Sequence, residues 1–254
     1  MKPLHITLEL MSHQSDREST HHRTWWKEFV KGHEDSEGHF YIATTHEPKD
    51  KRKRGWRYLP VALHQALMPG YIQQLKELPR MARGNVGWID EPSPHTFGIV
   101  SSNDRLPFRD STVTRIVRYN TIAPRSYNAE GQQDEETLLD ELREAYRVLK
   151  PGTKIEFHET RAEEMDASVS FNRIVELVKR FNDELRAKLV EAKIAEAAAK
   201  HKPAAVEADE AKIGFDTKRI TVRRYYAEDF VTDKAGKSMK IRLERHALTI
   251  PKLH

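Results

Sequence analysis

The hydrophobic and polar positions of residues 106–158 predict a strand, a helix and a second strand in succession. Apolar and β-branched side chains mark one strand over 113–119 and another over 154–158. Between them lies a helix whose apolar face consists of Leu138, Leu142, Ala145 and Leu149. Pro151 and Gly152 then end the helix. Two strands joined by a helix form a βαβ unit, so we expect this pair of strands to be parallel.

The same patterns place further elements on both sides of this unit. Strands are predicted over 4–10, 39–45, 86–91 and 96–100, and an interrupted helix over 59–78. A long helix over 166–200, a polar linker over 201–212 and a closing β-hairpin over 218–248 follow. We expect an N-terminal arm over 1–38 and one α/β domain over 39–254.

Composition limits the classes of protein to which the chain can belong. The 254 residues are 38% hydrophobic and 32% charged, which is enough apolar content for one packed domain. The absence of cysteine excludes disulfides and zinc–thiolate sites and is typical of a reducing compartment such as the cytoplasm. No apolar run approaches the length of a membrane span and no signal peptide is recognised, so no membrane partner is expected.

The net charge of +4 is mild, but positive charge is concentrated in residues 49–57. This loop either faces solvent or contacts phosphates of RNA. The candidate nucleic-acid contacts are Lys51, Arg52, Lys53, Arg54 and Arg57. Histidines are frequent between residues 13 and 46, but none has the helical spacing of a metalloprotease site, and no metal ligands are assigned.

Two stretches together resemble the class I S-adenosylmethionine-dependent methyltransferases, of the type 11 kind. Residues 103–113 are similar to the family's segment after its third strand, where an acid precedes Leu-Pro-Phe. Residues 142–155 are similar to its helix and turn before the fifth strand. The resemblance implies a Rossmann-like α/β fold, with a mostly parallel sheet and an antiparallel strand from a C-terminal hairpin. The implied cofactor is S-adenosylmethionine.

In this family the cofactor lies on a glycine-rich loop and is contacted by acids that follow the second and third strands. Carried over by position, Asp90 or Glu91 would hold the ribose, and Asp104 would contact the adenine. The other implied cofactor contacts are Thr44, Asn103 and Tyr119. These strand ends line the crevice of an open α/β sheet, and carboxylates accept hydrogen bonds from a ribose diol. They are equally the residues that cap backbone N–H groups in ordinary loops.

The chain departs from the family at the glycine-rich loop. If residues 39–43 are taken as the first strand, Thr44 and a proline follow where glycines are expected. Side chains there hinder close backbone approach to a cofactor. Two functions therefore follow. One is a methyltransferase in which Tyr119, Asn120 or His158 serves as a catalytic group. The alternative is an inactive scaffold, or an RNA- or protein-binding subunit of a larger assembly, using the loop 49–57 and the helix 166–200.

Overall fold

The computed structural model describes residues 4–10, 39–45, 61–68, 96–101, 103–119, 135–160, 167–200, 213–232 and 238–253. The strands are β1 (His5–Leu10), β2 (His39–Thr45), β3 (Thr96–Val100), β4 (Val113–Tyr119), β5 (Leu149–Thr160), β6 (Thr221–Thr232) and β7 (Ser238–Pro251). The helical elements are α3 (Val61–Ala66), α5 (Glu135–Val148), α6 (Ala167–Ala199) and a 3-10 turn, η4 (Thr217–Arg219).

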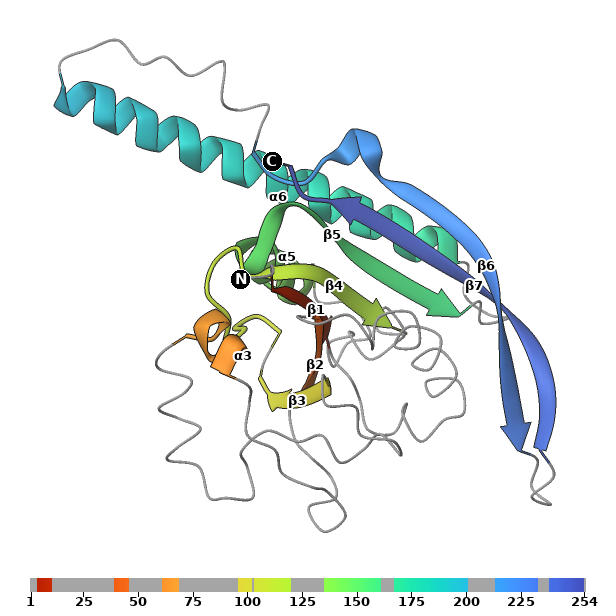
Figure 1. Ribbon diagram of the computed structural model, residues 1–254. Coiled ribbons are helices and arrows are strands. Elements are labelled where there is room, and N and C mark those ends of the chain that lie inside the picture. The colour runs from red at the N-terminus through yellow and green to blue at the C-terminus, as the bar shows by residue number, and fades with distance from the viewer. Residues whose placement is uncertain are drawn as a thin grey trace.

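The described strands form one seven-stranded sheet in the order β3-β2-β1-β4-β5-β7-β6 (Figure 1). The first five strands are parallel to one another, and β4 pairs with β5 as the βαβ pattern predicted. β7 is antiparallel to both β5 and β6. The expected Rossmann-like sheet, mostly parallel with an antiparallel C-terminal pair, is confirmed.

The position of β1 differs from the domain division expected from the sequence. Residues 1–38 were set apart as an arm, but β1 pairs with β2 on one side and β4 on the other. Alternating apolar side chains explain this position, since Ile6, Leu8 and Leu10 are all buried. The first strand of the sheet is therefore β1, and residues 39–45 form the second. The strand predicted over 86–91 and the loop 49–57 lie outside the described residues.

Helices α5 and α6 cover one face of the sheet. Their apolar residues meet Ile155 and Phe157 of β5 in the core. The stripe predicted on α6 is confirmed, because Phe171, Ile174, Val178 and Phe181 are buried, whereas the last turns of the helix are mostly exposed. No helix in the described part of the chain is both long and apolar enough to span a bilayer.

One arginine joins the end of α5 to the turn that precedes β4. Arg147 donates hydrogen bonds to the carbonyl oxygens of Phe108 (2.8 Å) and Leu106 (3.0 Å). Its guanidinium also contacts the carboxylates of Glu144 and Asp110. Glu144 in turn accepts a 2.7 Å bond from the backbone N–H of Leu106. The arginine and the glutamate therefore fix the turn onto the helix.

The turn needs one unusual backbone conformation to reach the helix. Ser111 has a φ of 55°, in the left-handed region that non-glycine residues seldom adopt. In this conformation, the N–H groups of Ser111 and Thr112 donate to the carbonyl oxygens of Arg147 and Val148, at 3.0 and 2.9 Å. These bonds satisfy carbonyl groups that the end of a helix leaves without partners. The strand β4 therefore begins at a position set by the end of α5.

A second connection joins α6 to the segment before β6. The side chain of Asn182 is buried and exchanges two hydrogen bonds with the backbone of Phe215, at 2.8 and 2.9 Å. Gly214 has a φ of +101°, and a Cβ atom there would lie 2.4 Å from the Asn182 Oδ1. Only glycine fits this position without displacing the asparagine.

The buried ammonium of Lys252 completes the contacts at the end of α5. Its Nζ donates to the carbonyl oxygens of Tyr146 (2.7 Å) and Leu149 (2.6 Å) and lies 4.1 Å from the centre of the Tyr146 ring. Burial lowers the pKa of Lys252 to about 8. The segment that follows β7 is thus attached to the same helix end as the turn before β4.

We expect the substitution Arg147→Met to lower the free energy of unfolding by about 2–3 kcal/mol, because it leaves two backbone carbonyls without their donor. The matched control is Arg143→Met on the same helix. Among the described residues, Arg143 binds the carboxylates of Asp140 and Glu184 at the surface, so its loss costs below about 1 kcal/mol. Urea denaturation of both variants measures the difference. Equal losses would show that the Arg147 contacts do not fix the turn.

Candidate functional site

The strand order reverses direction between β1 and β4. The chain proceeds from β1 to β2 and β3 on one side, and then crosses to β4 and β5 on the other. In open α/β sheets, ligands bind at this switch point, outside the carboxyl ends of the strands. Leu10 of β1 and Arg118 of β4 are in register there. Polar residues close to these two positions are therefore the first candidates for a binding site.

Four polar side chains form a buried network at this edge, on the side of α5. Thr44 Oγ1 lies 3.2 Å from Asn103 Oδ1, and Asn103 Nδ2 donates to Glu141 Oε1 at 3.3 Å. Glu141 also binds Arg118, with 2.5 Å between Oε2 and Nη1. All four residues are less than a tenth exposed. Four elements meet in this network: β2, the turn after β3, α5 and β4.

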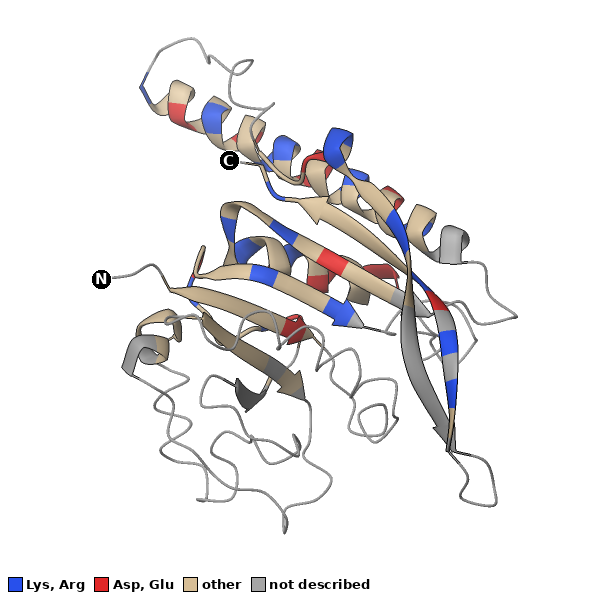
Figure 2. Ribbon diagram, turned by 45° about the vertical axis from the view of Figure 1, so that its right-hand side comes forward, with Lys and Arg blue, Asp and Glu red and all other residues tan. Residues whose placement is uncertain are grey.

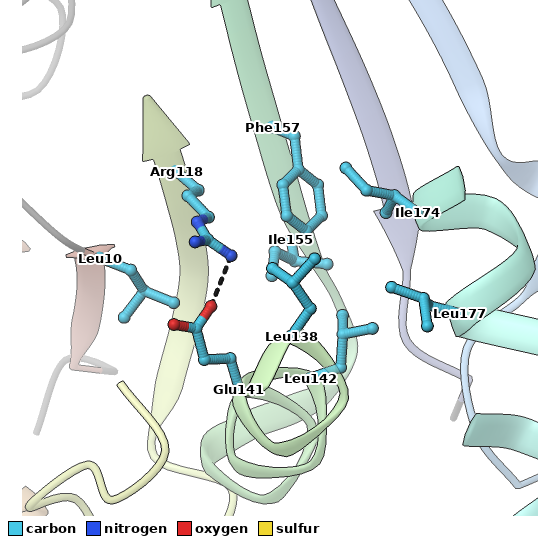
Figure 3. Close-up of a pocket in the computed structure, with 9 residues that line it drawn as sticks. All are labelled: Leu10, Arg118, Leu138, Glu141, Leu142, Ile155, Phe157, Ile174 and Leu177. Atoms are coloured by element: carbon cyan, nitrogen blue, oxygen red, sulfur yellow. Dashed lines mark hydrogen bonds and ion pairs between the residues drawn. The ribbon is translucent and has the colours of Figure 1, made fainter. Parts of the chain in front are cut away.

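The ion pair between Arg118 and Glu141 lies beside apolar side chains (Figure 3). The cavity next to it is lined by Leu10, Leu138, Leu142, Ile155, Phe157, Ile174 and Leu177 as well as the pair itself. Removing either charge would leave the other buried without its partner, which is strongly destabilising. The pair therefore fixes the relative position of α5 and the end of β4.

A carboxylate also lies at the end of β1. Glu9 is buried and accepts a hydrogen bond from the hydroxyl of Tyr41 on β2. Its backbone carbonyl lies 3.3 Å from Thr44 Oγ1. Because side chains alternate along a strand, Glu9 faces away from α5, whereas its neighbour Leu10 faces the α5 side. The carboxyl edge therefore carries polar groups on both faces of the sheet.

The site residues predicted from the sequence are only partly brought together. Thr44 and Asn103 are in contact, and Asp104 is exposed in the turn beside Asn103. Tyr119 is the last residue of β4 and pairs in register with His158 of β5. The side chain of Tyr119, together with Asp90, Glu91, Asn120 and the five basic residues of the loop 49–57, lies outside the described residues.

Two parts of the sequence interpretation need correction because β1 is the first strand of the sheet. The segment to compare with a glycine-rich loop follows Leu10 and does not begin at Thr44. Residues 11–31 contain no glycine, so a glycine-rich loop is missing at this corrected position as well. Asp90 and Glu91 do not follow the second strand, since β2 ends at Thr45. β2 itself ends in Thr44 and Thr45.

His158 belongs to a charged cluster on the face opposite α5 and α6. The cluster is centred on the buried carboxylate of Glu156, which binds Arg115 at 2.9 Å through Nε and Lys154 at 2.6 Å. His158 Nε2 lies 3.5 Å from Glu156, and its Nδ1 lies 2.9 Å from the hydroxyl of Tyr225 on β6. Both ring nitrogens of His158 are thus engaged. Tyr225 is more exposed than His158 and can meet a ligand more readily.

The environment of Glu156 favours its charged form. Burial alone would raise the pKa of this carboxyl group, but the hydrogen bond with His158 and the positive charges of Arg115 and Lys154 outweigh it. The net result is a pKa well below the usual range. Glu156 therefore remains ionised at neutral pH and can orient the imidazole of His158. No group of three or more metal-ligating side chains occurs among the described residues.

Sequence reasoning missed Glu9, Tyr41, Arg118 and Glu141. A signal existed for Glu141, because it follows Leu138 by three positions and so falls within the apolar stripe of its helix. A charged residue in such a stripe requires a buried partner. Arg118 shares the strand face of Ile116, which gives the same signal. The sequence alone did not indicate that these two residues meet.

Comparisons with known proteins were made for the whole chain. No family model matches the sequence, and no curated protein matches it. The structure is similar to a SAM-dependent methyltransferase from Methanosarcina mazei, with 11% identity and a TM-score of 0.39 over 100% of this chain and 94% of that one. A putative methyltransferase from Bacillus halodurans gives 12% identity and 0.38 over 100% and 95%.

A third solved structure, the [4+2]-cyclase SpnF, gives 12% identity and a TM-score of 0.38 over 100% of this chain and 76% of that one. Likeness at these levels of identity and TM-score carries no argument about function. The strand order and the side chains at the carboxyl edge are the features of this chain that bear on its function.

We expect Glu156 to make the free energy of unfolding depend on pH in the acid range. Its pKa is lowered by folding, so its contribution is complete above the ordinary value of 4.5 and is lost as the pH falls below it. The melting temperature of the native protein should therefore fall steeply from about pH 5 to pH 2, and Glu156→Gln should make this decline shallower. The exposed Glu176→Gln on α6 is the control. Parallel declines in the native protein and Glu156→Gln would disprove the assignment.

Proposed function

We propose that this chain is a methyltransferase-like protein that binds S-adenosylmethionine at the switch point between β1 and β4. The single observation that supports the proposal is the strand order, which brings Glu9 and the turn with Asp104 to one edge of a parallel sheet. A crevice of this kind is where open α/β sheets bind nucleotide-like ligands. The acceptor of the methyl group is left open.

The carboxylates at this edge fit the chemistry of the cofactor. Asp104 is exposed and its carboxylate can accept hydrogen bonds from a ribose diol or an adenine amino group. The buried carboxylate of Glu9 provides negative charge near the position of a cationic ligand. When bound, S-adenosylmethionine supplies a methyl group activated by the adjacent sulfonium.

The remaining polar residues have supporting roles in this proposal. Thr44 and Asn103 hold each other, so they shape the floor of the crevice and fix the turn that carries Asp104. Tyr119 and Asn120 follow at the end of β4 and are candidates for contact with the acceptor. His158 is a positioning residue, because its ring nitrogens contact Tyr225 and Glu156. Tyr225 would then be the group that meets a substrate proton.

Isothermal titration with S-adenosylmethionine and with its demethylated product tests this proposal. We expect saturable heat from the native protein, and at least about a tenfold loss of affinity in Asp104→Ala because a charged hydrogen-bond acceptor is removed. The control is Asp183→Ala, an exposed acid on α6 that contacts only Arg186.

Two outcomes would contradict the proposal. Absence of heat at millimolar cofactor would show that the crevice does not bind it. Unchanged affinity in Asp104→Ala would show that the ligand binds elsewhere. Unchanged unfolding curves for both variants would establish that the comparison reports binding and not loss of the fold.

A second candidate is a non-catalytic subunit with the same fold. Two observations favour it: residues 11–31 lack glycine, and Thr44, Asn103 and Glu141 satisfy one another inside the protein. A backbone that carries side chains approaches a cofactor less closely than glycine does. In this case the same titration gives no heat, and the chain acts through its surfaces in an assembly with RNA or protein.

A further inference from the structure

Strand β6 is an edge of the sheet and carries an unusual run of positive charge. It is the last strand in the sheet order, with β7 on one side and no described strand on the other. Residues 217–226 contain four basic residues and no acid. The side chains of Arg219 and Arg224 are 71% and 64% exposed. Figure 2 shows Lys and Arg along this edge and along the hairpin.

The hairpin extends beyond the rest of the sheet. β5 pairs with β7 only over residues 245–251, whereas β6 pairs with β7 over 238–249. Residues 238–244 therefore belong to a two-stranded ribbon, which projects from the sheet in Figure 1. Both Lys240 and Arg242 are exposed on this ribbon. The ribbon and the edge of β6 form one continuous surface.

An exposed aromatic ring lies among these charges. Tyr226 is 49% exposed, and the guanidinium carbon of Arg242 lies 4.5 Å from the centre of its ring. Arg224 lies on the same face of β6, two residues before Tyr226. The nearby acid, Glu244, is engaged by the Tyr226 hydroxyl at 3.2 Å and by His246 at 2.9 Å. Arg224 Nη1 lies 3.9 Å from the Glu244 carboxylate, so this cation partly offsets the charge of the acid that holds the tyrosine.

From this arrangement we infer that the β6–β7 surface binds single-stranded nucleic acid. Arg224, Lys240 and Arg242 share the face of Tyr226 and would contact phosphates, and Tyr226 would stack on an unpaired base. Exposed aromatic rings beside arginines on a sheet are how proteins without strong sequence preference hold single strands. This surface uses none of the residues of the proposed cofactor site, so the inference does not depend on the proposed function.

Two other occupants fit the surface less well. An acidic peptide could pair with the open edge of β6, but it would use the backbone and the positive charges and would leave Tyr226 without a role. A nucleic-acid duplex would offer phosphates, but its bases are stacked and cannot pack on a tyrosine ring. The exposed ring therefore favours a single strand.

Fluorescence anisotropy with the full chain tests the inference, using a labelled mixed-sequence RNA of twelve nucleotides and the matching single-stranded DNA. We expect binding that weakens as salt rises. The double variant Arg224→Gln with Lys240→Gln should lower affinity roughly tenfold and reduce the slope of log affinity against log salt by about 1.4, for two lost phosphate contacts. Tyr226→Ala should also lower affinity roughly tenfold, whereas Tyr226→Phe should retain it.

The control for net charge is Lys179→Gln with Lys188→Gln, two exposed lysines on α6. Equal losses of affinity in this control and in the double variant of the β6–β7 surface would overturn the inference, because binding would then follow total charge. Retained affinity in Tyr226→Ala, or equal competition by unlabelled duplex or by polyglutamate, would also overturn it. All of the variants change exposed side chains, and circular dichroism confirms that each one is folded.

Discussion

The contact between Arg147 and the turn before β4 is the constraint on which much of this structure depends. It brings the end of α5, the start of β4 and the start of β5 to one place. Lys252 reaches the same helix end from the segment after β7. Because β4 is thereby fixed at its amino end, its carboxyl end is fixed as well, beside β1. The position of the crevice is thus set from the opposite edge of the sheet.

The two faces of the sheet differ in how they are stabilised. The face toward α5 and α6 is packed with apolar side chains, and its buried polar groups include the network that ends at Arg118 and Glu141. The opposite face of β4 and β5 carries Arg115, Glu156 and His158 in contact with one another. Charged groups that satisfy each other at low exposure favour one geometry, since any displacement leaves a buried charge without its partner.

Much of the fold could be predicted from periodicity, and much less of the site. The spacing of Leu138, Leu142 and Ala145 defined α5, and alternation defined β4. The sheet order could not be predicted in this way, because strand periodicity does not say which strands are neighbours. A comparison that starts from residues 39–45 as the first strand therefore places Thr44 at the wrong loop. The contact between Arg118 and Glu141 was missed for the same reason: it joins elements whose adjacency only the fold reveals.

The place of β7 has a consequence for how the chain reaches its native state. β7 lies between β5 and β6, although it follows both in the sequence. β6 and β7 can pair with each other as a hairpin, but β5 remains an open edge until β7 pairs with it. The contacts between β5 and β7 join residues far apart in the chain, and such contacts form late and slowly. We therefore expect the half-formed sheet, with its exposed strand edges, to be the species most prone to aggregation during synthesis and refolding.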